Sequence, residues 1–459
     1  MLSLARVIQV LLTLVVFWLC SLRLDKALYG TYQKIFVVIG FCSSLLALGL
    51  PLLIASLPAA QLEGLIRLIW KRTGRVYLAL FLIIAVFILA FMRILPLPTR
   101  CLLLGLSLTS ALYSVAEMLT IKRGKNRLVF LINLLYACAF GGIHYFFLFR
   151  VAFSLNALLG ALTLLGILRI CFTGTWEKSG TIPRREAPGD ATLYTRQWTY
   201  LSLNQGLEAF SGNIDNLFLL WLLSAPLFAV YFNGSYEIPV SGILVSAAGT
   251  FISVQINQAG MGNAGILSLF HRVCLLLSCL LFPLFFFLQA NAGLLFSWAF
   301  HGKYNDSVDI FLISSWILPL RVANYTVLLQ NKMRSQRVFQ GSLLGVVAKI
   351  LLCTVLYNFF GVRGVAAAMV MGTGAQIVFY LYHSAKALDT RIYSVMPFLK
   401  LLLFFILFGI LSFAGQWCVS RFMPGSGIVL PSLLFVTLAC LSLLIYYPAA
   451  RKGVSGAGS

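Results

Sequence analysis

Apolar segments about 20 residues long recur from one end of the chain to the other. Each can cross the hydrocarbon core of a bilayer, because a spanning α-helix needs about 20 mostly apolar residues. Only 10% of the residues are charged and 61% are hydrophobic, whereas soluble domains carry about 25% charged residues. Backbone polar groups in lipid must be satisfied internally, which favours helices. The sequence therefore predicts an all-α polytopic membrane protein.

On this rule we place about fourteen transmembrane helices. The expected spans are 2–20, 34–57, 76–96, 98–120, 128–149, 152–173, 200–224, 237–258, 266–289, 308–328, 341–360, 364–384, 395–418 and 426–448. Close spacing around Pro96–Thr99 and Arg150–Phe153 predicts tight hairpins. No small-residue cleavage site follows the first span, so we interpret it as a retained helix rather than a signal peptide.

The longest hydrophilic stretch, Thr173–Arg196, falls near the middle of the chain and is expected to be a linker. This predicts two six-helix lobes, at 1–180 and 181–388. A C-terminal helix pair with a short cytoplasmic tail is expected at 389–459. Gln61–Lys71 is apolar on one face and basic at its end, which is typical of an interfacial helix.

Basic residues outnumber acidic ones, 34 to 12, and they concentrate in alternate loops. By the positive-inside rule these loops and both termini are cytoplasmic. Insertion therefore accounts for the positive charge, and nucleic-acid binding is not expected. The loops that carry most of the cations contain Arg67, Lys71, Arg72, Arg75, Lys122, Arg123, Lys125, Arg127, Lys178, Arg184, Arg185, Arg196, Arg272, Lys332, Arg334, Arg337, Lys386, Arg391, Arg451 and Lys452. The opposite loops contain fewer, among them Arg23 and Lys34.

Two acids stand inside one expected span, Leu203–Leu223. Glu208 and Asp215 are seven residues apart, so in a continuous helix they would stack on one face, with Asn204 and Ser211 on the same stripe. Ionisable groups at membrane depth are costly and normally face a protein interior or a water-filled cavity. The stripe is therefore a candidate site.

Cations also occur in or beside apolar spans. Arg169 and Lys400 lie near span ends, and we expect them to snorkel to the interface. Arg321 and Lys349 are flanked by apolar sequence on both sides, and Arg321 follows the helix-kinking Leu318-Pro319. Arg6 is interpreted as the flank of the first span. These positions supply candidate partners for the two acids.

Several short motifs resemble one transporter family. They are Leu22-Arg23 with Ala27–Gln33; Ala47–Pro51; Ile214-Asp215, Phe228–Tyr231 and Glu237–Pro239; Phe300–Tyr304, Ser307 and Leu318–Arg321; and Phe360–Ala367. Together they are similar to the polysaccharide-transport, or O-antigen flippase, branch of the multidrug/oligosaccharidyl-lipid/polysaccharide flippase superfamily. The N-terminus is shorter than the family pattern, and the turn at Gln330–Arg334 is a looser match.

The resemblance implies a flippase that moves lipid-linked oligosaccharide, a precursor of lipopolysaccharide O-antigen or another surface polysaccharide, across the bacterial inner membrane by alternating access. It implies a polyprenyl pyrophosphate substrate, membrane lipids as surroundings, and a polysaccharide polymerase and glycosyltransferases as partners. Arg23, the arginine of the opening pattern, joins the candidates. Arginine and lysine side chains suit a pyrophosphate.

Three roles stay open for Glu208 and Asp215. They could neutralise those cations in the empty state, or take up a proton or Na⁺ during transport. They could instead pair permanently with Arg321 or Lys349 and hold the lobes in register. They could also lie at the cytoplasmic end of the span, outside any site.

Enzyme signatures are not found in the sequence. It contains no P-loop, dinucleotide fingerprint or G-x-S-x-G motif, and its four histidines are isolated. The ten cysteines show no metal-ligand spacing. We therefore expect no catalytic residue, cofactor or metal. The alternatives to a flippase are a cation-coupled multidrug antiporter of the same superfamily and a membrane glycan polymerase or ligase.

Overall fold

The computed structural model describes residues 2–56, 75, 77–91, 95–173, 191–236, 239–259, 262–422 and 429–440, and every regular element in them is a helix. The chain forms two compact units, unit 1 at 1–229 and unit 2 at 230–459. The expected interfacial helix at 61–71 and most of the expected linker at 173–196 lie outside the described residues. The division into lobes at 1–180, 181–388 and 389–459 stays a prediction.

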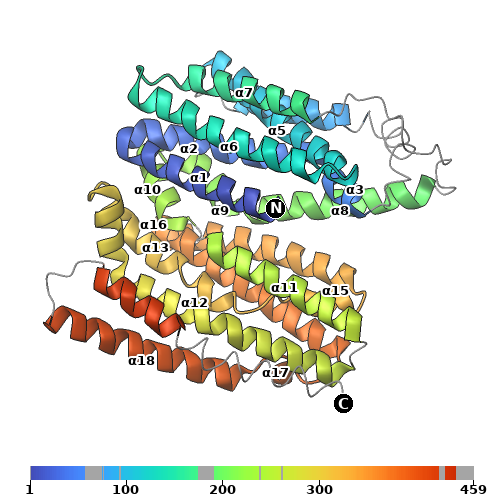
Figure 1. Ribbon diagram of the computed structural model, residues 1–459, viewed down its shortest axis with the longest axis vertical. Coiled ribbons are helices and arrows are strands. Elements are labelled where there is room, and N and C mark those ends of the chain that lie inside the picture. The colour runs from blue at the N-terminus through green and yellow to red at the C-terminus, as the bar shows by residue number, and fades with distance from the viewer. Residues whose placement is uncertain are drawn as a thin grey trace. The chain divides into compact units, whose positions relative to one another are not determined.

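In unit 1 the long helices α1, α2, α5, α6 and α7 run alongside one another (Figure 1). Helix α5 contacts both α2 and α7, and α1 contacts α6. The α6–α7 hairpin expected around residue 150 is present, because α6 ends at Phe149 and α7 begins at Leu155. The helices of this unit are α1 (Leu2–Arg23), α2 (Lys26–Ala47), α3 (Leu50–Ser56), a π-helical turn at Phe87–Phe91, α5 (Leu97–Lys122), α6 (Asn126–Phe149), α7 (Leu155–Phe172), α8 (Ala191–Ser211) and α9 (Ile214–Leu222). Helix α10 (Ala225–Ser235) crosses the boundary between the units.

The expected span 34–57 is divided in two, between α2 and α3. Leu48 and Gly49 both adopt positive φ, at 44° and 65°, and this left-handed turn ends α2. The Leu48 carbonyl, freed from helical bonding, accepts hydrogen bonds from Trp198 Nε1 at 2.9 Å and Ser202 Oγ at 2.6 Å. Side chains of α8 therefore satisfy a polar group that lipid could not.

Unit 2 is organised around the 38-residue helix α12 (Asn263–Phe300). Its apolar face forms the centre of the core, with Phe270, Phe282 and Phe285 almost fully buried. Helix α18 (Phe398–Phe422) packs along it, and the side-chain amides of Asn291 and Gln416 hydrogen-bond across this contact at 2.9 Å. The other elements are α11 (Pro239–Ala259), a 3₁₀ turn at Asn305–Ser307, α13 (Val308–Ser314), α14 (Ile317–Leu320), α15 (Val327–Asn331), α16 (Ser335–Ala387), α17 (Ile392–Val395) and an apolar helix at Val429–Cys440.

Helix α16 is a helical hairpin rather than one long rod. Gly361 has a non-helical backbone, φ 57° and ψ −137°, which separates the two spans expected at 341–360 and 364–384. The two arms pack closely through glycines. A Cβ at Gly341 would lie 2.2 Å from the Tyr380 ring, and one at Gly345 would lie 2.9 Å from the Gln376 side chain. Tyr380 also hydrogen-bonds Ser342, at 2.9 Å.

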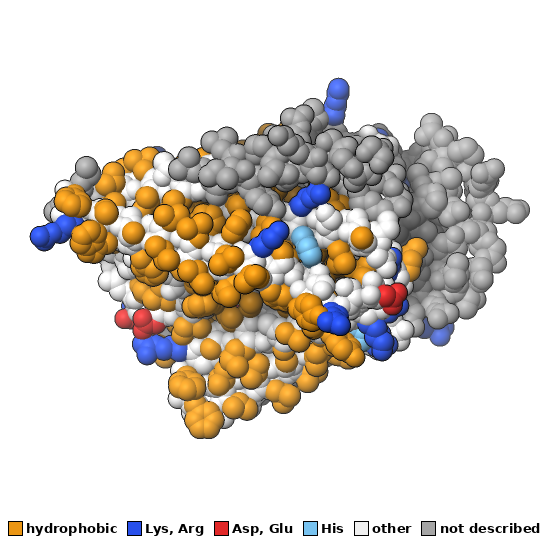
Figure 2. Space-filling view, turned by 90° about the horizontal axis from the view of Figure 1, so that it is seen from below, with side chains coloured by type: hydrophobic (Ala, Val, Ile, Leu, Met, Phe, Trp, Pro, Cys, Tyr) orange, Lys and Arg blue, Asp and Glu red, His pale blue; other side chains and the backbone are white. Residues whose placement is uncertain are grey.

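Seven helices in the described part of the chain are long and apolar enough to cross a membrane, and four shorter apolar helices accompany them. On the face drawn in Figure 2, hydrophobic side chains cover most of the described surface, while Lys, Arg, Asp and Glu are few. Such a surface suits lipid rather than water. These observations confirm the predicted all-α polytopic membrane architecture.

Candidate functional site

The stretch Leu203–Leu223 is not one continuous helix. Helix α8 ends at Ser211 and α9 begins at Ile214, so a turn at Gly212-Asn213 separates the two acids. The Asn213 side chain donates to the Ala209 carbonyl at 2.9 Å, in competition with the backbone N–H that would continue the helix. The single stripe through Glu208 and Asp215 was therefore a wrong prediction.

The two acids occupy different surroundings in unit 1. Glu208 is exposed and accepts a hydrogen bond from Asn204 Nδ2 at 2.9 Å, as their i, i+4 spacing predicted. Asp215 is buried, with 6% of its surface exposed, in the first turn of α9. An acid in the first turn of a helix is stabilised by the positive end of the helix dipole. Burial makes Asp215 the more constrained of the two.

The opposite end of α9 is held by a lysine from α2. Lys34 Nζ donates to the carbonyl oxygens of Leu220 at 2.8 Å and Leu223 at 2.6 Å. It also lies 5.4 Å from the centre of the Phe228 ring. Lys34 was expected in a loop, but it lies inside α2, which begins eight residues earlier, at Lys26. A cation at the last carbonyls of a helix stabilises its negative end.

Helix α2 approaches the turn after α9 without room for a side chain. A Cβ at Gly30 would lie 1.8 Å from the Ala225 carbonyl oxygen. Gly30 is one helical turn before Lys34, so close backbone approach and the lysine contacts act on the same face of α2. Together they fix the position of α9, and with it Asp215.

The other candidate residues are carried by other helices. Arg23 is the last residue of α1; it is exposed, with its guanidinium carbon 4.4 Å from the centre of the Phe149 ring. Arg321, in unit 2, follows the last residue of α14 and is half-buried. Lys349 is 7% exposed on the first arm of α16. A Cβ at Gly372, on the second arm, would lie 2.4 Å from Lys349 Cγ.

These positions bring Asn204 and Glu208 together within unit 1, and they place the two membrane-depth cations Arg321 and Lys349 in unit 2. Pairing of Glu208 or Asp215 with Arg321 or Lys349 stays a prediction. The expected span 308–328, which contains Arg321, is divided into α13, α14 and α15 with irregular backbone at 321–326. Pro319 in α14 lacks a backbone N–H and explains part of this break.

A polar cluster inside unit 1 was not predicted. The Arg169 guanidinium carbon lies 3.5 Å from the centre of the Tyr113 ring and 3.8 Å from that of Tyr136. Arg169 Nη2 and the Tyr113 hydroxyl both donate to Asn133 Oδ1, and Asn133 Nδ2 donates to Glu117 Oε1 at 2.9 Å. Arg169, on α7, therefore does not snorkel as expected, because side chains of α5 and α6 hold it.

Spacing in the sequence contains a signal for this cluster. Tyr113 and Glu117 are four residues apart on α5, and Asn133 and Tyr136 are three apart on α6, so each pair shares a helix face. Polar or ionisable pairs on apolar helices normally face protein rather than lipid. The same rule applied to 98–120 and 128–149 would have marked the cluster.

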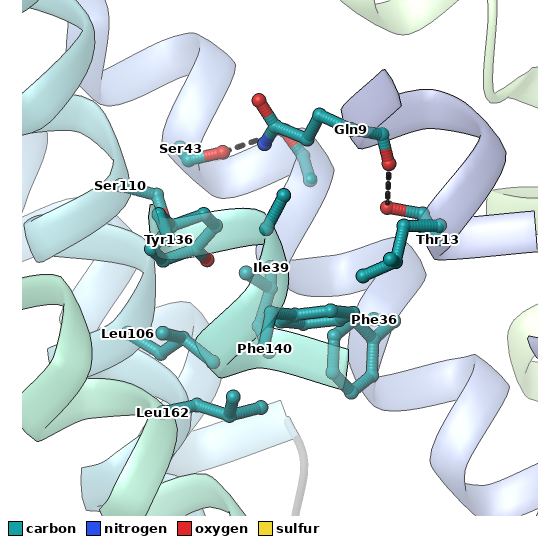
Figure 3. Close-up of a pocket in the computed structure, with 13 residues that line it drawn as sticks. Gln9, Thr13, Phe36, Ile39, Ser43, Leu106, Ser110, Tyr136, Phe140 and Leu162 are labelled. Carbon is teal, nitrogen blue, oxygen red and sulfur yellow. Dashed lines mark hydrogen bonds between the residues drawn. The ribbon is translucent and has the colours of Figure 1, made fainter. Parts of the chain in front are cut away.

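Beside this cluster lies a cavity of about 240 Å³, lined by residues of α1, α2, α5, α6 and α7. Figure 3 shows Phe36, Phe140, Leu106 and Leu162 forming its apolar wall, while Gln9 and Ser43 lie at its polar side. Tyr136 belongs to both structures, because it lines the cavity and stacks on Arg169. Tyr136 thus joins the cavity to the cluster.

No group of three or more His, Cys, Asp or Glu side chains that could hold a metal comes together in the described residues. The ten cysteines all lie in the described part of the chain and form no disulfide bonds.

Comparison with known proteins gives no matching family model and no matching curated protein. Solved transporter structures do match. The lipid II flippase MurJ in an inward closed conformation aligns with a TM-score of 0.67 at 12% identity, over 98% of this chain and 99% of that one.

Two MATE structures match less fully. An inward-facing MATE transporter of the MOP superfamily has a TM-score of 0.58 at 13% identity, over 83% of this chain and 94% of that one. A MATE in the straight conformation has a TM-score of 0.53 at 14% identity, over 84% of this chain and 94% of that one. The chain therefore has the fold of MOP-superfamily transporters. Membership of the superfamily, and of its O-antigen branch, stays a prediction.

Proposed function

We propose that the protein is a flippase that translocates lipid-linked oligosaccharide across the cytoplasmic membrane by alternating access. One observation carries the proposal: the match to the lipid II flippase extends over 98% of this chain, whereas the multidrug transporters match 83% and 84%. Substrates of this class combine a polyprenyl tail, a pyrophosphate and a glycan. No covalent chemistry on the substrate is involved, so no catalytic residue or cofactor is assigned.

Within this proposal the cations bind the pyrophosphate. Arg321 is the strongest candidate, because it stands half-buried at a helix break, where irregular backbone is tolerated only if it faces protein or a cavity. Arg23 at the end of α1 would meet the substrate near the membrane surface. Lys349 has a smaller part, since its stem packs on Gly372 inside a helical hairpin.

The acids serve the coupling step. Asp215, buried in the first turn of α9, takes up a proton or Na⁺, and Glu208, hydrogen-bonded by Asn204, neutralises a cation when no substrate is bound. The concentration of cations in alternate loops supports a multi-pass orientation with both termini in the cytoplasm of a bacterium. A polysaccharide polymerase and glycosyltransferases would act on the same substrate before or after transport.

The test is flipping of a fluorescent polyprenyl-pyrophosphate oligosaccharide by the purified protein in vesicles. Asp215→Asn, Glu208→Gln and Arg321→Gln are each expected to lower the flipping rate at least tenfold. The control is Asp306→Asn, an exposed acid in the 3₁₀ turn at Asn305–Ser307. Wild-type rates from both acid variants would overturn the coupling role.

The multidrug antiporter remains the second candidate, because the MATE structures share this fold. It predicts that an imposed proton or Na⁺ gradient drives efflux of a cationic dye. Dye efflux without glycolipid flipping would replace the proposed function. Glycolipid flipping without dye efflux would establish it.

A further inference from the structure

A second cavity lies in unit 2, beside the helix break that follows α14. Its volume is about 290 Å³, near the lower limit for small-molecule sites. One wall belongs to α11 and the other to residues 324–330. We call it the α11 groove; its lining residues are Ser246, Gly249, Thr250, Ser253, Val254, Asn324, Val327 and Gln330.

The depth of the groove depends on one glycine. A Cβ at Gly249 would lie 2.3 Å from Asn324 Nδ2, so the Asn324 amide rests directly on the α11 backbone. Asn324 stands in the irregular segment between α14, which ends at Leu320, and α15, which begins at Val327. Discontinuous membrane helices with irregular backbone commonly form transporter binding sites.

The lining side chains of the groove carry no charge. They offer three hydroxyls and two amides, on Ser246, Thr250, Ser253, Asn324 and Gln330. Ser246, Thr250 and Gln330 are exposed and therefore accessible to a ligand. Thr250 donates its hydroxyl proton to the Ser246 carbonyl at 3.1 Å, which leaves the oxygen lone pairs available as acceptors.

Neutral donors and acceptors do not suit a pyrophosphate or a cationic drug, because neither charge would be compensated there. They suit a polyol, whose hydroxyl groups both donate and accept hydrogen bonds. Arg321 begins the same break three residues before Asn324, so a cation for the pyrophosphate is adjacent to the groove along the chain.

From this geometry we infer that the α11 groove binds the saccharide part of the transported glycolipid. The inference rests on the proposed function and assigns the two polar parts of the substrate to different residues. The groove recognises sugar hydroxyls, and the cations recognise the pyrophosphate.

The experiment compares two probes on the full-length protein in nanodiscs: a polyprenyl-pyrophosphate oligosaccharide and polyprenyl pyrophosphate without sugar. Ser246→Ala and Thr250→Val each remove an exposed hydroxyl. Each is expected to weaken binding of the sugar-bearing lipid about fivefold, the effect of one neutral hydrogen bond. Binding of the sugar-free lipid should not change. Thr354→Val is the matched control, because Thr354 is exposed on α16 and donates only to the Ile350 carbonyl among the contacts described.

The possible outcomes distinguish a failure of the saccharide-binding inference from a failure of the proposed flippase function. If the groove variants bind the sugar-bearing lipid as tightly as wild type, or if wild type binds both probes equally, the saccharide role of the groove is overturned while flipping still stands. If wild type neither binds nor flips the sugar-bearing lipid, the proposed function itself falls. Thermal unfolding of each variant confirms that it is folded before binding is measured.

Discussion

Lys34 Nζ donates a hydrogen bond to the Leu223 carbonyl oxygen at 2.6 Å, across 189 positions of sequence. The same ammonium donates to the Leu220 carbonyl. These bonds attach the last turn of α9 to α2 and set the position of a helix whose first turn contains the buried Asp215.

Lys34→Met removes both bonds and leaves two carbonyls at the C-terminus of α9 without this donor. Hydrogen bonds to charged groups contribute about 1.5 to 3 kcal/mol each, so for two bonds we expect a loss of about 3 to 6 kcal/mol in the free energy of unfolding. SDS-induced unfolding of the purified protein measures it. Lys400→Met, at an exposed lysine of α18, is the control and should change little. Equal stabilities for the two variants would contradict the role of Lys34.

Two glycines on α2 should respond oppositely to alanine. At Gly30 the new Cβ would meet the Ala225 carbonyl oxygen at 1.8 Å, whereas at Gly40 it would meet nothing within 4 Å. Gly30→Ala should cost about 3 kcal/mol, because backbone must move to relieve the clash. Gly40→Ala should be neutral or stabilise by up to about 1 kcal/mol, since alanine favours the helix. Unfolding curves of the two variants provide the measurement, and similar curves would show that α2 does not approach Ala225 closely.

Asn133→Leu should destabilise unit 1 by about 3 kcal/mol. The substitution removes the acceptor for Arg169 and Tyr113 and the donor to Glu117, which leaves a partly buried cation without its amide partner. The matched control is Asn358→Leu, at an exposed asparagine of α16 that donates to the Thr354 carbonyl. A double-mutant cycle with Glu117→Gln then measures the coupling, and strictly additive losses would show that the two residues act independently.

The register of the α16 hairpin can be tested by cross-linking. The pairs Gly341–Tyr380, Gly345–Gln376 and Lys349–Gly372 fix an antiparallel register in which Cys353 lies opposite Ala368. Both residues are fully buried. With the remaining cysteines replaced, Ala368→Cys should form a disulfide with Cys353 under mild oxidation in membranes. Ala367→Cys, turned by about 100° on the helix, should not. The reverse pattern would show a shifted register.

Hydropathy alone predicted the helical class and most of the spans, because a bilayer imposes length and apolarity on each segment separately. The kink at Gly361 was also predictable, since a glycine-rich turn separates two spans that are each long enough. The breaks at Leu48–Gly49 and Gly212–Asn213 were not predicted. Each interrupts an apolar stretch, and a side chain satisfies a carbonyl at the break: Trp198 at the first and Asn213 itself at the second.

Contacts between distant helices account for the other errors. Lys34 looked like a loop cation because its acceptors come from α9, and Arg169 looked like an interfacial cation because its partners come from α5 and α6. A cation near the end of a span is equally compatible with lipid headgroups and with a protein partner. Tertiary packing decides between them, and for Arg169 the signal lies in the polar spacing on α5 and α6 rather than in the sequence around Arg169 itself.

Because α2 contacts α9, the packing of unit 1 can be completed only after α9 has been synthesised. Domains fold from the N-terminus as the chain is synthesised, and α1, α2, α5, α6 and α7 are all translated before α9. Their assembly nevertheless lacks one piece until residues 214–225 leave the ribosome, near the midpoint of the 459-residue chain. A nascent chain truncated before this point would insert its first helices and leave the contact face around Gly30 and Lys34 uncovered.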